Sequence, residues 1–148
     1  MVRLLVAAAL AIAPDALVLA GAGGILCLDP RDGASRWQAG AEASRRLLAL
    51  DDVTLFTGHR QRGVLARDLE RGDVLWSRPD LRGVAALLRD GDERLFALRD
   101  AQILSLDPTS GATQWTLPLS PAAPLAGIAL GPGQLAYVSA GRELLAIG

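Results

Sequence analysis

The stretches ILCLDPRDGASRW (25–37), VLARDLERGDVLW (64–76) and ILSLDPTSGATQW (103–115) are three copies of one pattern, and they decide the fold. Each copy ends in a tryptophan, and successive tryptophans are 39 residues apart. Self-similarity at a fixed period is the signature of a repeat architecture. The recurring residues are the tryptophans Trp37, Trp76 and Trp115, the glycines Gly33, Gly72 and Gly111, the aspartates Asp29, Asp68 and Asp107, and the leucines Leu26, Leu65 and Leu104.

Each copy reads as a β-hairpin. The run before the aspartate is apolar and β-prone, which predicts a strand. The Asp-x-x-x-Gly stretch predicts a turn, because aspartate can accept hydrogen bonds from backbone amides two residues further on and glycine supplies a positive φ. The short segment that follows and ends in tryptophan predicts the next strand.

Two further apolar runs precede each hairpin, so each repeat predicts four short strands. Four strands at a period of 39 residues are typical of a β-propeller blade. We therefore expect an all-β protein, a partial propeller of about four four-stranded blades in a single domain over residues 1–148. The expected blades are 7–38, 45–77, 83–117 and 125–148, the last of them incomplete because its outer strand is missing.

The stretches LDPRDGASRW and LDPTSGATQW resemble the repeat of pyrroloquinoline-quinone-type (PQQ-like, WD40-like) β-propellers, whose blades carry an Ala/Leu-x-Asp-x-x-x-Gly-x-x-x-Trp pattern. The resemblance covers three copies and part of a fourth. The middle copy departs from the pattern, with Arg67 where the others have leucine and Leu69 where they have proline. The resemblance implies that Trp37, Trp76 and Trp115 dock between neighbouring blades and are structural.

The incomplete fourth blade predicts a protein partner. Propellers typically close with about 4–8 blades, so this chain is expected to expose blade faces and an unpaired strand edge. Three arrangements stay open: two copies closing one ring, a different subunit supplying the other blades, or four blades closing tightly on themselves. We expect a non-enzymatic interaction or scaffold module of a bacterial multi-protein assembly, acting as a homodimer or with another subunit. A fragment of a longer gene product is a further reading.

Residues suited to catalysis are few, so no catalytic, cofactor-binding or metal-binding residue is predicted. His59, the single histidine, is expected to be a solvated turn residue, and Cys27 a small hydrophobic residue within a strand. One histidine and one cysteine cannot build a zinc site from nitrogen and sulfur ligands within a single chain. The acidic stretches Asp51-Asp52 and 90–93 lack calcium-loop spacing and are expected to be solvated turns.

Quinoprotein dehydrogenases share this repeat type, which gives an alternative function. The chain would then be a ligand-binding or quinoprotein-like oxidoreductase subunit whose central site forms only on ring closure. The sequence contains no haem-attachment motif and no recognisable set of cofactor ligands. We therefore predict no cofactor.

Composition excludes several classes of protein. With 51% apolar residues and a net charge of −1, the composition is not that of a disordered chain. It also lacks the excess of basic residues that is typical of nucleic-acid-binding proteins. No apolar run reaches the roughly 20 residues that span a bilayer. Residues 1–13 resemble a short secretory signal, but Pro14 follows the cleavage position and the repeats use 7–13 as a strand. A cytoplasmic location is therefore expected, or a periplasmic or secreted one if residues 1–13 act as a signal.

Overall fold

Over the residues that it describes, a computed structural model shows fifteen strands in four antiparallel sheets. It describes residues 7–21, 23–40, 48–59, 61–90, 92–119, 125–131, 135–140 and 142–147. Residues 1–6 of the signal-like segment lie outside this part of the chain. Ala7–Ala13, by contrast, form strand β1, so cleavage after Ala13 would remove the inner strand of the first sheet.

Each sheet is a meander in which consecutive strands pair. The first contains β1 (Ala7–Ala13), β2 (Ala16–Gly21), β3 (Gly24–Leu28) and β4 (Ser35–Ala39). The second contains β5 (Leu48–Leu50), β6 (Thr54–His59), β7 (Gly63–Asp68) and β8 (Val74–Arg78). The third contains β9 (Val84–Arg89), β10 (Leu95–Arg99), β11 (Gln102–Leu106) and β12 (Thr113–Pro118). The fourth contains β13 (Leu125–Leu130), β14 (Ala136–Ala140) and β15 (Glu143–Ile147).

The repeat places equivalent residues in equivalent cross-strand rows. In the second sheet Phe56 pairs with Ala66, which pairs with Trp76. In the third sheet Phe96, Ser105 and Trp115 form the same row, as Val18, Cys27 and Trp37 do in the first. Because side chains alternate between the faces of a strand, each row points to one face of its sheet. That face is turned toward the next sheet in the chain.

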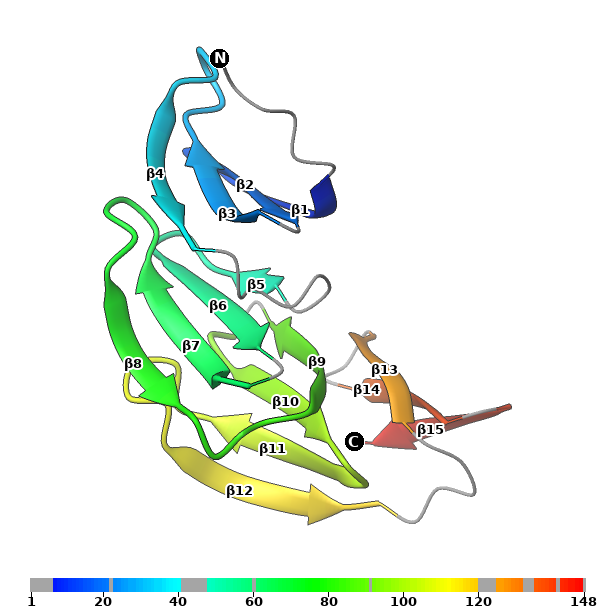
Figure 1. Cartoon of the computed structure of the whole chain (residues 1–148). Coiled ribbons are helices and arrows are strands. Elements are labelled where there is room, and N and C mark those ends of the chain that lie inside the picture. Colours follow the sequence, from blue (N-terminus) through cyan, green and yellow to red (C-terminus); the bar gives the residue numbers. More distant parts are fainter. Residues whose placement is uncertain are drawn as a thin grey trace.

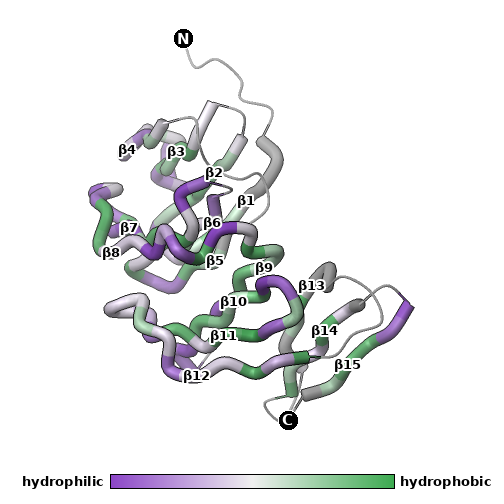
Figure 2. Tube along the Cα trace, turned by 60° about the horizontal axis from the view of Figure 1, so that its bottom comes forward, coloured by the Kyte–Doolittle hydropathy of each residue, from purple (hydrophilic) through white to green (hydrophobic). Residues whose placement is uncertain are grey.

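The core consists of apolar layers between successive sheets. The first layer, between sheets one and two, contains the fully buried Val18, Cys27 and Leu55, and the second contains Phe56, Leu95 and Leu106. The third is smaller and joins Phe96, Leu98 and Ile103 to Val138 of β14. Figure 2 shows hydrophobic colour along β9 to β11 and along β15, with polar colour at several of the turns.

Figure 1 shows the four sheets following one another along an arc, from β1–β4 at the N-terminal side to β13–β15. The inner strands contact one another in sequence, β1 with β5, β5 with β9 and β9 with β13. Among the described residues, no comparable contact joins β13–β15 back to β1–β4. The predicted all-β partial propeller is confirmed, and the sheets do not close tightly on themselves.

Candidate interaction site

The Asp-x-x-x-Gly turns share one geometry in all three repeats. The glycine amides donate to the aspartate carbonyls at 2.7–2.8 Å, and the three glycines have φ of 74–80°. The Asp29 and Asp107 carboxylates also accept from the backbone amides of Arg31 and Thr109, two residues on. The sequence-predicted aspartates and glycines thus build hairpin turns between the third and fourth strands.

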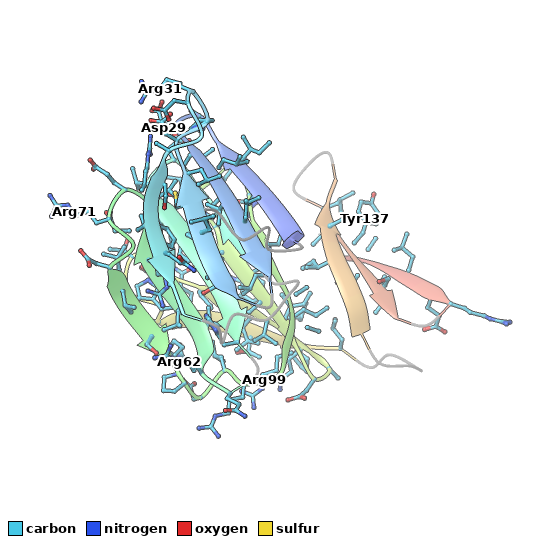
Figure 3. All side chains as sticks on the ribbon, turned by 45° about the horizontal axis from the view of Figure 1, so that its top comes forward. Asp29, Arg31, Arg62, Arg71, Arg99 and Tyr137 are labelled. Carbon is cyan, nitrogen blue, oxygen red and sulfur yellow. The ribbon has the colours of Figure 1, made fainter. Side chains whose placement is uncertain are left out.

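Hydrogen bonds hold two of these carboxylates in the charged form. The Arg31 guanidinium, which donates to Asp29, keeps the pKa of that carboxyl well below its usual range. Figure 3 shows this pair at the tip of the first turn. The amides of Ser110 and Thr109 lower the pKa of Asp107.

Trp37 and Trp76 dock onto the turn of the following blade. The Trp37 Nε1–H donates to the Leu69 carbonyl at 2.8 Å, and the Trp76 Nε1–H donates to the Pro108 carbonyl at 2.8 Å. Each indole also lies on a turn glycine. A Cβ added at Gly72 would be 2.6 Å from the Trp37 ring, and one added at Gly111 would be 2.6 Å from the Trp76 ring. Each of these two indoles therefore packs directly against the turn backbone of the next blade.

The two departures of the middle repeat fit this geometry. Leu69 stands where the other repeats have proline, and its carbonyl is the acceptor at the junction, a group that both residue types possess. Unlike proline, Leu69 also donates its amide to the Val53 carbonyl at 2.8 Å, and its side chain is buried between the first two sheets. Arg67, in the leucine position, donates from Nη1 to the Gly72 carbonyl at 3.0 Å, and burial lowers its pKa.

In the described part of the chain no turn covers Trp115, and no indole lies on Gly33. Trp115 is 47% exposed, although Phe96 of its own sheet lies 5.9 Å from its ring, much as Phe56 lies 6.0 Å from Trp76. Gly33 is exposed, and a Cβ added there would have no atom within 4 Å. The series of docked turns therefore begins with an uncovered turn and ends with an uncovered indole.

The two end sheets also keep apolar faces uncovered. Leu144 on β15 is 67% exposed, whereas Ile103, at the equivalent place on β11, is 2% exposed. Figure 3 shows Tyr137 on the side of the fourth sheet that is turned away from the other three. On the first sheet Ile12 is 68% exposed, and Leu17, paired with it, is only half-buried. Residues equivalent to Leu17 and Leu144 are buried in the inner blades, because a neighbouring sheet covers them.

His59 corrects one prediction from the sequence. It is not a solvated turn residue but the last residue of β6, 4% exposed, with Nε2 2.8 Å from the Thr57 Oγ1. The strand runs two residues further than the turn-like sequence GHRQRG suggested, because His59 pairs with Gly63. Cys27 is fully buried, and burial raises the pKa of its thiol, as suits a core residue.

The acidic turns are exposed at Asp52 and at 92–93, as predicted, but two of their aspartates are largely buried. The Asp51 carboxylate accepts from the amides of Val53 and Thr54 and forms an ion pair with Arg89 at 3.2 Å. The Asp90 carboxylate is 4% exposed and is paired with Arg94. These two aspartates stabilise hairpin turns, and each forms an ion pair with an arginine.

Charged side chains line two open grooves where neighbouring sheets meet. One, of about 660 Å³, lies between the first two sheets and includes Asp15, Arg31, Asp68 and Glu70. The other, of about 470 Å³, lies between the second and third sheets and includes Asp51, Arg89 and Glu93. Across the described residues no group of three or more histidine, cysteine or acidic side chains could hold a metal ion. No helix in the same residues is long and apolar enough to cross a membrane.

Comparison with solved structures gives the same architecture. The chain superposes on BamB from Moraxella catarrhalis with a TM-score of 0.78 and 21% identity, over 93% of this chain and 45% of that one. It superposes on the computationally designed Ika4 protein with a TM-score of 0.78 and 17% identity, over 99% of this chain and 94% of that one. For the designed Ika8 protein the TM-score is 0.73 and the identity 16%, over 93% of this chain and 44% of that one. At these identities the likeness establishes the fold.

Sequence comparison adds a curated relative and a family. The chain is 30% identical over 110 residues to the serine/threonine-protein kinase AfsK of Streptomyces coelicolor, over 70% of this chain and 14% of the kinase. It thus spans about a seventh of the length of that relative. A sequence model of the family described as outer membrane protein assembly factor BamB matches residues 1–117, which include all three tryptophan repeats. This chain belongs to that family of PQQ-type propeller repeats.

Proposed function

We propose that the chain is a non-enzymatic protein-interaction module that joins further propeller blades through the uncovered faces of its two end sheets. The observation that carries this is the contrast between Leu144, 67% exposed, and its counterpart Ile103, 2% exposed. The same position is covered where a further blade follows and open where none is described. Fully burying a leucine side chain stabilises by about 1.5–3 kcal/mol, so a partner sheet over this face gains substantially.

A second copy of the chain is the first partner we propose. The chain matches 45% of the BamB chain and 44% of the Ika8 chain, so its blades have the relative placement found within longer arrays. Two copies would then have the blade number of such an array. A different subunit that contributes blades is the second candidate, and it would use the same two faces.

The proposed test is the mass in solution, measured by light scattering over a dilution series. A dimer that dissociates on dilution is expected for self-association. The variant Leu144→Glu should shift the midpoint of dissociation to higher protein concentration. Leu75→Glu is the matched control, because Leu75 is a 55% exposed leucine on β8, away from both end faces. A monomer at all concentrations would reject the homodimer and direct the search to a different subunit by pull-down from the host.

We also propose a location for the chain in the cell, the periplasm. The family description names the outer membrane, so it does not support the cytoplasmic location expected from the sequence. A periplasmic location would bring the chain into the environment that this description names. Fractionation of the native host with an antibody to the chain tests it.

A further inference from the structure

We propose that the two grooves between neighbouring sheets form one binding site for an extended, basic segment of a partner protein. The segment carries an apolar side chain between two arginines or lysines. The site lies along one rim of the sheets, where the second sheet contributes residues to both grooves. It uses neither of the uncovered faces of the two end sheets, and it does not depend on self-association.

Charge is sorted between the two rims of the sheets. One rim, which we call the acidic rim, consists of the turns from first to second strand and from third to fourth strand in the first three sheets, and aspartates and glutamates outnumber arginines there. Arg62, Arg99 and Arg142 lie at the other rim, at the turns from second to third strand. Figure 3 shows Asp29 at one rim and Arg62 and Arg99 at the other. A chain of net charge −1 therefore has one rim that attracts basic ligands.

Three exposed carboxylates along the acidic rim have no ion pair or hydrogen bond in the described part of the chain. Asp52 lines both grooves, Glu70 lines the first and Glu93 lines the second. The neighbouring Asp51 and Asp90, by contrast, are paired with arginines. Unpaired negative charge therefore extends from one groove across the second sheet into the other, which suits a ligand with two separated cations.

Val53 places an apolar side chain between these charges. It is 67% exposed and lines both grooves. Its amide donates to the Asp51 carboxylate at 3.0 Å, and its carbonyl accepts from the Leu69 amide at 2.8 Å, so the turn that carries it is fixed in place. An apolar side chain of the segment that covers Val53 removes both surfaces from water, which is favourable. This contact gives the proposed order of side chains: basic, apolar, basic.

Arg89 supplies a donor for the backbone of the segment. Its side chain is 9% exposed and lines the second groove. Its Nε and Nη2 lie 3.3 Å and 3.2 Å from one Asp51 oxygen, whereas its Nη1 is buried without a hydrogen-bond partner among the described residues. A buried donor without an acceptor is costly. A small rotation of the guanidinium toward the groove lets Nη1 donate to a backbone carbonyl of the segment, a neutral acceptor that the acidic rim does not repel.

The spacing of the grooves sets the spacing of the basic side chains. Packed sheets lie about 10 Å apart, so grooves on either side of one sheet are about that far from each other. An extended peptide rises about 3.3 Å per residue, and alternate side chains point to the same side. Basic residues at the first and fifth positions with an apolar one at the third therefore fit, because long side chains can bend to take up the small difference in length.

The proposed test is a titration of the ¹⁵N-labelled full chain at low salt with the peptide acetyl-GRSVSRG-amide. Backbone amide shifts should concentrate at Asp52, Val53, Glu70 and Glu93, with a dissociation constant of about 1 mM, in keeping with two exposed ion pairs and one apolar contact. The charge-reversed peptide acetyl-GESVSEG-amide should cause no shifts there. A linear eight-carbon diamine has the same charge as the first peptide but no acceptor for Arg89, so it should bind about fivefold more weakly.

Variants of the chain test the site itself. Combined substitution Asp52→Asn, Glu70→Gln and Glu93→Gln should weaken peptide binding by about tenfold, because each exposed ion pair contributes a factor of about 2–5. Asp100→Asn is the matched control, since Asp100 is exposed at the other rim with a φ of 49°, a backbone that asparagine also adopts. It should leave the dissociation constant within about twofold. All four positions are exposed, so the variants should fold like the parent.

Absence of shifts at several times the expected dissociation constant would overturn the proposal. Equal weakening by Asp100→Asn and by the triple variant would do so too, because the peptide would then follow the overall charge of the chain and not this site. Equal affinity for the peptide and the diamine would reject a peptide ligand. Leu144→Glu should leave peptide binding unchanged, so this proposal and the joining of blades through the end faces fail independently.

Discussion

Substituting alanine at Gly111 tests whether the docked indoles hold neighbouring blades together. Gly111 has a φ of 74°, and an added Cβ would lie 2.6 Å from the Trp76 ring. Gly33 is a close internal control, because its φ is also 74° but an added Cβ would meet nothing within 4 Å. The two substitutions share the backbone cost and differ in the contact with tryptophan.

The expected magnitudes follow from these contacts. A left-handed backbone costs a residue with a Cβ about 1–2 kcal/mol, and this applies to Gly33→Ala and Gly111→Ala alike. Gly111→Ala adds overpacking of about 1–3 kcal/mol and weakens the hydrogen bond from Trp76 to Pro108, worth about 1 kcal/mol. Gly111→Ala should therefore lose about 2–4 kcal/mol more stability than Gly33→Ala.

Urea denaturation measures this difference. With a slope of about 2 kcal/mol per molar urea, the middle of the usual range, the midpoint of Gly111→Ala should lie roughly 1–2 M below that of Gly33→Ala. Fluorescence gives a second readout, because displacing the half-buried Trp76 should red-shift the emission of the folded Gly111→Ala protein. If the two midpoints agree within the error, the glycine serves only the turn backbone, and the argument from indole docking is wrong.

Three further predictions concern single side chains. Trp76→Phe removes the donor to Pro108 and should cost about 1 kcal/mol or more in urea unfolding, whereas Trp115→Phe, at an exposed site, should stay within about 0.5 kcal/mol of the parent. The folded pKa of Asp107 lies below its unfolded value of about 3.9, so its carboxylate stabilises the fold above that pH and this contribution is lost as the pH falls through the folded pKa. The destabilisation by Asp107→Ala should therefore be full at neutral pH and shrink toward pH 3 or below, and a constant penalty over this pH range would contradict the assignment. Cys27, fully buried with a raised pKa, should react with a thiol reagent only as the fold opens, so the rate should rise steeply with urea.

The repeat spacing was sufficient to predict the architecture. The equal spacing of Trp37, Trp76 and Trp115 fixes the period, and the turn residues separate strands that the structure places within a few residues of the expected positions. This works because the signal is local: strand, turn and strand follow within thirteen residues. The family resemblance rests on the same residues and is confirmed by the family match over residues 1–117.

Features that depend on a neighbouring blade could not be predicted. Nothing in the sequence around Trp115 distinguishes it from Trp76, because the difference lies in whether another turn covers the ring. Likewise, the sequence near His59 resembles a turn, and only the pairing of His59 with Gly63 extends the strand. The burial of Asp90 depends on Arg94 across the hairpin, a contact that composition cannot reveal. Leu69 departs from the repeat, yet the acceptor that it offers to Trp37 is a backbone carbonyl, which any residue has.

That the junction acceptor is a backbone carbonyl bears on how such arrays can evolve. The indole N–H donates to a backbone carbonyl, which every residue has. A duplicated blade could therefore be inserted beside another without a compensating substitution at the acceptor residue. Copies can then differ at the residue next to the aspartate and keep this acceptor, as Leu69 and Pro108 do. Growth or loss of whole repeats would be easier in this lineage than in folds where each interface needs its own matched pair of side chains.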